Sequence, residues 1–254
     1  MRRPRYAELI WYRGLADLHA DAARGYVGFA WWVLEPLLYM MAFYLAFGLG
    51  LRQGGEHRLL FLLSGLVPWK LFSSTVQNGG GIIQANSGLI QQVYLPKYIL
   101  PSMVLVTNGM KFLIILALLL CLAAYTNGIG TSWLALPFLV VVELMLTLAL
   151  ASLAAALVPL LPDLDLIISN GLVVMLFISG VINDISRLPP SVAQVLRLNP
   201  MVPVIAGFHD VLVSKVWPDW SALAAVLLAS CMIYALALWL LKRFDRSYPK
   251  LMIV

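Results

Sequence analysis

The chain has 254 residues, of which 62% are hydrophobic and 11% are charged. Soluble domains are about 45–50% apolar and about 25% charged, so this composition excludes a soluble globular protein, a disordered protein and a nucleic-acid-binding protein. One membrane crossing takes roughly 20 apolar residues, which leaves room for about five to seven transmembrane helices. We therefore predict an all-α membrane protein with one domain over residues 1–254.

Residues 1–29 contain Glu8, Asp17 and Asp21 ahead of the first apolar run, which argues against a cleaved signal peptide. Arg13 and Asp17 are four residues apart and can pair on one helical face. Apolar residues recur at helical spacing on another face, namely Ala7, Trp11, Leu15, Leu18 and Ala22. The pattern predicts an amphipathic interface helix that either anchors the first span or also contacts a cytoplasmic partner.

Six apolar runs are long enough to predict six transmembrane helices. In chain order they are Ala30–Leu49, Leu59–Gln77, Met103–Tyr125, Trp133–Val158, Leu166–Ile182 and Leu223–Leu241. Ten Lys and Arg residues fall on the side of the two termini and five on the other side, with Lys70 and Lys111 inside spans. Because Lys and Arg are enriched on the cytoplasmic side, both termini are expected in the cytoplasm of a bacterial inner membrane.

The first run carries an aromatic stripe, with Trp32, Tyr39, Phe43 and Phe47 at intervals of seven, four and four residues beside Trp31. Aromatic rings at the two interfaces would form an ordinary belt, but a stripe through the depth of the membrane can also let sugar rings slide past. Packing against neighbouring helices is the alternative explanation.

Two connections between spans have unusual composition. Residues 79–101 begin with three glycines, and Pro96 and Pro101 flank the last few residues of the segment. This composition predicts a hinge, a short helix and a turn, or else an ordinary loop. Residues 183–220 contain two apolar stretches, each too short to span, that are separated by Asn199 and Pro200. They indicate re-entrant or interfacial helices, which survive at membrane depth only when protein or a water-filled cavity surrounds them.

Three ionisable residues lie inside the predicted spans: Lys70, Lys111 and Glu143. Such groups are costly in hydrocarbon and are functional candidates, although an ion pair between Glu143 and one lysine that orients the helices is the simpler interpretation. No G-x-S-x-G, H-E-x-x-H, Cys/His zinc spacing or Walker motif occurs. We therefore expect no catalytic residue, no metal site and no ATP site in this chain.

Four strings, taken together and in order, resemble the permease subunits of type-2 ABC exporters of lipid-linked polysaccharide. Each string matches the family pattern through a few residues: Gly28, Trp32 and Pro36; Gly65, Pro68, Trp69, Phe72 and Ser74; Asn86, Leu89, Pro96, Lys97 and Pro101; and Leu188, Pro189, Asn199, Pro200 and Pro203. One departure is the connection LLPDLDL, where Pro162 stands in place of the arginine that usually precedes the aspartate.

The resemblance implies a homodimer of six-span subunits with a pore at its interface and two separate ATPase subunits that bind ATP and Mg²⁺. It implies that the interface helix, through Trp11, Leu15 and Leu18, and the 79–101 segment, through Asn86, Leu89 and Lys97, dock on the ATPases. Residues around Pro189, Asn199, Pro200 and Pro203 would form periplasmic gate helices, and the aromatic stripe would line the sugar path.

The resemblance favours O-antigen as the exported polymer, with capsular polysaccharide or teichoic acid as alternatives within the family. A drug or lipid ABC exporter is a more remote alternative. A proton-coupled secondary transporter would need several intramembrane acids and inverted repeats, and an intramembrane hydrolase would need a nucleophile and a base. The sequence offers neither set.

Overall fold

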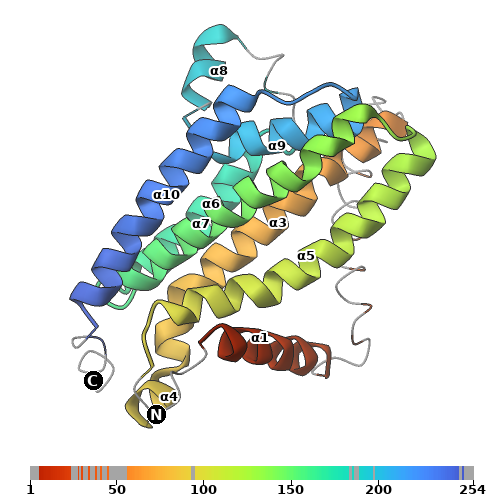
Figure 1. Cartoon of the computed structure of the whole chain (residues 1–254). Coiled ribbons are helices and arrows are strands. Elements are labelled where there is room, and N and C mark those ends of the chain that lie inside the picture. Colours follow the sequence, from red (N-terminus) through yellow and green to blue (C-terminus); the bar gives the residue numbers. More distant parts are fainter. Residues whose placement is uncertain are drawn as a thin grey trace.

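The computed structural model describes residues 6–23, 56–92, 95–182, 189–196 and 198–245, together with single residues between and after these ranges. Its longest elements are five helices: α3 (Glu56–Ala85), α5 (Ile99–Thr126), α6 (Leu136–Leu157), α7 (Asp163–Ile178) and α10 (Trp220–Arg243). They run side by side in one bundle (Figure 1). The prediction of an all-α protein is confirmed for the described residues.

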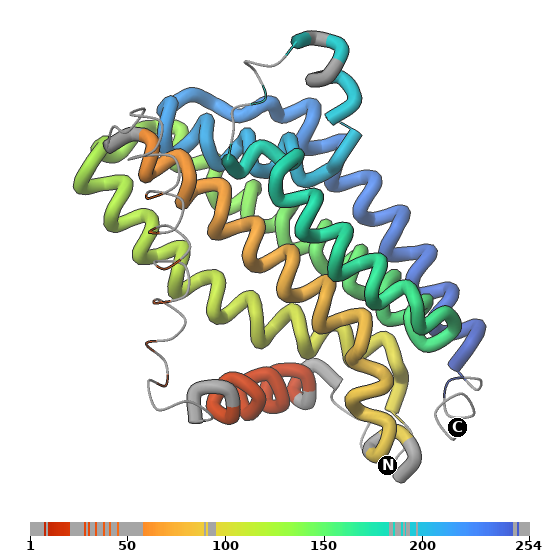
Figure 2. The backbone as a smooth tube through the Cα atoms, turned by 180° about the vertical axis from the view of Figure 1, so that it is seen from behind, coloured from red at the N-terminus to blue at the C-terminus, as the bar shows by residue number. Residues whose placement is uncertain are grey.

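Short elements gather at the two ends of this bundle (Figures 1 and 2). One end, here called the terminal end, carries α1 (Tyr6–Ala23), α4 (Ser87–Gln92) and the end of α10. The opposite end, here called the far end, carries the 3-10 helix η2 (Thr131–Ala135), α8 (Pro190–Leu196), α9 (Met201–His209) and the π-helical turn η4 (Asp210–Ser214).

Four helical segments are long and apolar enough to cross a membrane: Arg58–Ala85, Ile99–Thr126, Thr131–Leu157 and Trp220–Arg243. They coincide with four of the six predicted spans. The predicted span Leu166–Ile182 is represented by α7, whose 16 residues reach only about 24 Å at 1.5 Å per residue. Most of the first run lies outside the described residues, so the count of six stays a prediction.

Local sequence explains several helix boundaries. Asp219 caps α10, because its Oδ1 accepts hydrogen bonds from the backbone N–H groups of Ser221 (3.0 Å) and Ala222 (3.2 Å). Lys242 and Arg243 lie in the last turn of α10, where positive charge is favourable beside the free carbonyls. Pro159 has no N–H to donate, and α6 ends just before it at Leu157.

The predicted glycine hinge at the start of 79–101 is wrong. Gly79, Gly80 and Gly81 are helical, because α3 continues through Ala85 before α4 begins. A Cβ added at Gly79 would lie 2.9 Å from the Cβ of Ala151 and 3.1 Å from its carbonyl oxygen. This glycine therefore serves a close crossing of α3 and α6, which composition alone does not distinguish from a hinge.

α6 is the central helix of the bundle and packs against both α3 and α10. Leu139, Val142 and Leu146 on α6 have no exposed surface and belong to the large apolar core. A second, smaller core lies at the terminal end, where its ten residues come from α3, α4, the α4–α5 turn, α5, α6, α10 and the residues that follow α10. The outer faces of α5, α7 and α10 expose large apolar side chains, as expected of surfaces that meet lipid or another protein.

Candidate functional site: the two ends of the bundle

The far end of the bundle contains the buried segment Met201–Ser214, which comprises α9 and η4 and is here called the plug. Met201, Val204, Ile205 and Phe208 have no exposed surface. The plug contacts α3, α5, α6 and α10 as well as η2. Protein therefore surrounds this apolar stretch, whereas the other stretch exposes Val195 on α8. A re-entrant position of either stretch in the membrane stays a prediction.

Side chains from neighbouring elements hydrogen-bond to the irregular backbone of the plug. The amide nitrogen of Asn127, just after α5, donates to the carbonyls of Leu212 (3.1 Å) and Val213 (2.8 Å). The hydroxyl of Ser132 in η2 donates to the carbonyl of Val211 at 3.2 Å. These bonds satisfy carbonyls that a π-helical turn leaves without regular partners, so the plug has a defined structure although it is too short to span.

Two polar residues fix the ends of α9. Asn199 precedes the helix, where its Oδ1 accepts from the N–H of Met201 (3.0 Å) and its Nδ2 donates to Ser179 Oγ (2.7 Å) at the end of α7. His209 is buried at the other end of α9, with its ring stacked on Phe61 at a centroid distance of 3.8 Å and Nε2 3.0 Å from the Phe61 carbonyl. The plug is thus tied to both α7 and α3.

The residues predicted for the gate fall around this plug but are not equally placed. Pro203 lies within α9, Pro200 caps that helix and Asn199 links it to α7. Pro189 is exposed at the start of the separate short helix α8. The structure therefore brings three of the four gate candidates together at the start of α9, where each is half-buried, whereas a gating role for any of them stays a prediction.

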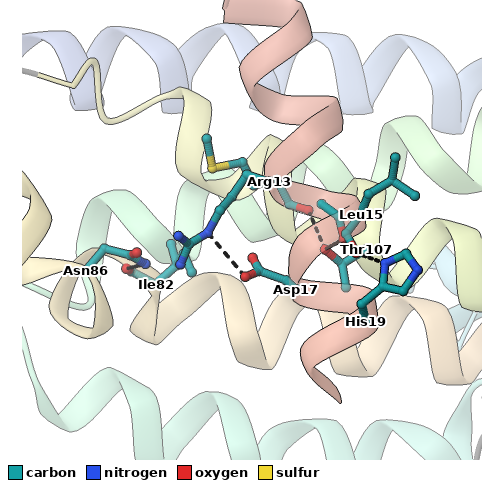
Figure 3. Close-up of polar contacts among 9 residues, drawn as sticks. Arg13, Leu15, Asp17, His19, Ile82, Asn86 and Thr107 are labelled. Atoms are coloured by element: carbon teal, nitrogen blue, oxygen red, sulfur yellow. Dashed lines mark hydrogen bonds and ion pairs between the residues drawn. The ribbon is translucent and has the colours of Figure 1, made fainter. Parts of the chain in front are cut away.

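At the terminal end, α1 packs against α5 through a face that differs from the predicted one (Figure 3). The Gly14 carbonyl accepts a hydrogen bond from Thr107 Oγ1 at 3.3 Å, and a Cβ at Gly14 would lie 2.7 Å from Val106 Cγ1. Leu18 is buried one turn later, whereas Trp11 is exposed. The predicted face was derived from the spacing of apolar side chains, and glycine has none. The pattern therefore missed Gly14, where the absence of a side chain lets the two helix backbones approach closely.

The outward face of α1 carries an ion pair and two exposed aromatic rings. Arg13 Nε lies 3.2 Å from Asp17 Oδ1, and both side chains are about half exposed (Figure 3), as the predicted pairing requires. Trp11 and Tyr12 are 53% and 70% exposed, while Leu15 is half-buried. Large aromatic side chains this exposed mark a surface suited to lipid headgroups or to a protein partner.

The other coupling candidates lie on α4 and in the turn that follows it. Asn86 lies between α3 and α4, and its side chain donates to the carbonyl of Ile82 at 2.9 Å (Figure 3). The side chain of Leu89 lies outside the described residues. Lys97 is turned inward, and its Nζ pairs with Asp245 Oδ1 at 3.2 Å.

The predicted ion pair of Glu143 is wrong. Glu143 on α6 is fully buried, Thr147 Oγ1 donates to its Oε1 at 3.4 Å, and its Oε2 has no hydrogen-bond partner. Among the described residues, neither Lys70 nor Lys111 forms an ion pair with Glu143. All three residues lie inside predicted spans, but their positions in the sequence do not say which other helix each side chain faces.

The predicted sugar path lies outside the described residues, since this is where Trp31, Trp32, Tyr39, Phe43 and Phe47 fall. Among the described helices, α7 exposes an apolar surface that includes Leu166, Val173, Val174 and Phe177. Asn170 is exposed on the same helix and donates to the carbonyl of Leu166 at 2.8 Å. A polar amide at this position is unusual on a face that meets only lipid.

Comparison with known proteins decides the family. A family model described as ABC-2 type transporter matches residues 18–213, which is well over half of the chain. The chain belongs to the ABC-2 transporter family. Members of this family are membrane-spanning permeases, in agreement with the four long apolar helices.

Individual ABC-2 relatives match over most of their length. The chain is 32% identical over 237 residues to the O-antigen export system permease protein RfbA of Myxococcus xanthus, covering 89% of this chain and 90% of the relative. It is 24% identical over 202 residues to a protein of the same name from Klebsiella pneumoniae, covering 79% and 78% of the two chains. The resemblance inferred from the sequence strings is thereby confirmed.

Two residues at the terminal end and two at the far end escaped the sequence analysis: Asp245, Tyr248, Asn127 and Ser132. Asn127 begins the string NGIG, a turn signal that could have identified it as a residue with a structural role. Asp245 and Tyr248 follow the basic end of α10 in a short polar segment with no motif. Nothing in their local sequence indicates that both pack against distant parts of the chain.

Proposed function

We propose that this chain is the membrane-spanning subunit of an ATP-driven exporter that moves lipid-linked polysaccharide, O-antigen first among the candidates, from the cytoplasm to the periplasm. The observation that carries the proposal is the 32% identity, over nine-tenths of both chains, to a permease named for O-antigen export. The chain has no Walker motif, so the energy would come from ATP and Mg²⁺ bound by a separate ATPase subunit.

Export tests the polymer directly. A strain that lacks this permease should lose long polysaccharide from its surface, and the intact chain should restore it when its ATPase partner is present. Restored capsule or teichoic acid in place of O-antigen would assign the chain to a sister branch of the family. Restoration without any ATPase would contradict an ATP-driven mechanism and favour ion-coupled transport.

The polymer path is proposed to lie between two copies of the chain. Support comes from the exposed face of α7, where Asn170 stands among apolar side chains, and from the aromatic stripe of the first span. Trp32→Ala or Tyr39→Ala should lower surface display several-fold without loss of membrane insertion, since each variant removes a large aromatic face that the C–H groups of a sugar ring could contact. Unchanged display from both variants would remove the stripe from the path.

Cross-linking tests the homodimer. Cys121 and Cys231 are both exposed and should first be replaced by serine. In that background, Val174→Cys on the exposed face of α7 should form a disulfide-linked dimer on mild oxidation. Leu228→Cys on the exposed face of α10 is the matched control and should stay monomeric. Dimers from Leu228→Cys alone would place the interface on α10.

The terminal end is proposed to be cytoplasmic and to dock on the ATPase subunits through α1 and α4. Two features support this assignment: the excess of Lys and Arg at that end and the exposed Trp11 and Tyr12 on α1. Trp11→Ala should weaken co-purification with the ATPase, while Leu18→Ala should also loosen α1 from α5. Equal co-purification of the Trp11 variant and the unaltered chain would remove this residue from the contact.

A further inference from the structure

The described residues after α10 pack against the terminal end, and the docking surfaces described above do not include them. The described residues of this segment, Phe244, Asp245 and Tyr248, are here called the tail. Tyr248 has no exposed surface, and Asp245 is only 20% exposed. A C-terminal segment buried to this extent has a structural partner, which the next contacts identify.

The first contact joins the tail to the turn between α4 and α5. Lys97 Nζ lies 3.2 Å from Asp245 Oδ1, and the lysine side chain is 4% exposed. The turn itself is rigid, because the N–H groups of Ile99 and Leu100 donate to the carbonyls of Pro96 and Lys97. A lysine this buried needs a counter-charge, so Asp245 fixes the position of the turn relative to α10.

The second contact joins the tail to the end of α6. Tyr248 Oη donates to the carbonyl of Ala156 at 3.1 Å. That carbonyl is among the last four of α6, and the N–H of Leu160, its regular partner, donates to Leu157 instead. Tyr248 therefore satisfies a carbonyl that the helix end leaves free. Burial, with a smaller contribution from the nearby Asp245 carboxylate, raises the pKa of Tyr248 to about 12.

The same core holds the coupling segment. Ile90 of α4, Leu95 of the turn and Ile99 of α5 share one buried apolar cluster with Ala156 and Tyr248. The tail is thus in contact with three elements that are far apart in sequence: the α4–α5 turn, the end of α6 and the end of α10. If α4 moves, either α6 and α10 move with it or the contacts of the tail break.

We propose that the Lys97–Asp245 pair and the Tyr248–Ala156 hydrogen bond form a clamp that transmits movement of α4 to α6 and α10. Lys97, Asp245 and Tyr248 are positioning residues in this scheme: they link α4 to the helices that reach the far end and need not touch the partner or the polymer. The inference rests on the proposed function, because it takes α4 as the element on which the ATPase acts.

Hydrogen exchange on the permease alone, in lipid nanodiscs, tests whether the clamp exists. Asp245→Asn removes the carboxylate that pairs with the buried Lys97, and amides of the C-terminal peptide should exchange at least about tenfold faster. Tyr248→Phe keeps the ring and removes only the hydroxyl, and exchange should rise by about fivefold. Lys242→Met, on an exposed neighbour in α10, is the matched control and should leave exchange unchanged.

Nucleotide response tests whether the clamp transmits movement. In the complete complex, ATP bound to a hydrolysis-deficient ATPase should change exchange at Met201–Ser214 in the unaltered permease. This change should fall several-fold in Asp245→Asn and Tyr248→Phe although the complexes still assemble. The charge-reversed double variant Lys97→Asp, Asp245→Lys should recover part of it.

Wild-type exchange in both single variants would overturn the clamp. Suppose that the tail exchanges faster in these variants but ATP still changes exchange at the plug as much as in the unaltered permease. This result would show that the clamp does not transmit movement. Failure of the unaltered complex to export polysaccharide would count against the proposed function alone, since the nucleotide response does not require the polymer.

Discussion

The two ends of the bundle differ in how they are held. The plug at the far end is embedded among α3, α6 and α10, and its carbonyls are bonded by Asn127 and Ser132. At the terminal end, α1 bonds to α5 through Gly14, the tail bonds to the α4–α5 turn and to α6, and α4 contributes Ile90 to the smaller apolar core. Local unfolding requires less free energy where fewer buried contacts must break. We therefore expect movement to originate at the terminal end and the plug to respond as a unit.

The largest expected effect comes from crowding the plug. A Cβ at Gly65 on α3 would lie 3.0 Å from His209 Nε2 and 3.1 Å from Val181 Cα, so Gly65→Val should force α3 away from α9. We expect a loss of about 3 kcal/mol of stability, measured by thermal unfolding in detergent. Gly81→Val in the same helix meets nothing within 4 Å and is the matched control. Equal unfolding temperatures would contradict tight packing at the far end.

The next largest effect is a difference in stability between alanine variants of two asparagines, one at each end of the bundle. Asn127→Ala would leave the carbonyls of Leu212 and Val213 without this donor, at a cost of about 1–3 kcal/mol. Asn86→Ala at the terminal end loses only a bond within its own helical turn and should cost less than about 0.5 kcal/mol. Unfolding of the two variants under the same conditions checks the difference, and equal losses would show that the two ends are equally constrained.

A smaller effect on stability is expected from detaching α1. Gly14→Leu should push α1 from α5, because even a Cβ would lie 2.7 Å from Val106 Cγ1. Backbone exchange within α1 should rise while the bundle loses less than about 1 kcal/mol. Ala16→Leu, on the exposed face of the same helix, is the control. Cooperative loss of the whole bundle in Gly14→Leu would show that α1 belongs to the core.

The smallest effect is expected at Glu143. Thr147 can donate to the amide oxygen of Glu143→Gln as it does to the carboxylate, and no ion pair is lost. Stability should change by less than about 1 kcal/mol, whereas breaking a buried ion pair costs about 3–5 kcal/mol. A loss of that size, reversed by neutralising Lys70 or Lys111, would restore the ion-pair interpretation.

The sequence by itself determined the class of protein, the four long apolar helices and the resemblance to polysaccharide exporters. These follow from local properties, since the length and hydropathy of a run decide whether it can cross a membrane. The amphipathic helix and the short apolar plug were predicted for the same reason, from periodicity and from the length of each run.

The tertiary structure decided which faces meet. Gly79 lies at a helix crossing because Ala151 is opposite it, Glu143 forms no ion pair within the described part of the chain, and the buried Lys97 pairs with Asp245. In each case the partner lies far away in the chain, and a helical period specifies a face without specifying its neighbour. The closure of long loops and the packing of helices select that neighbour, and neither is encoded in a local pattern.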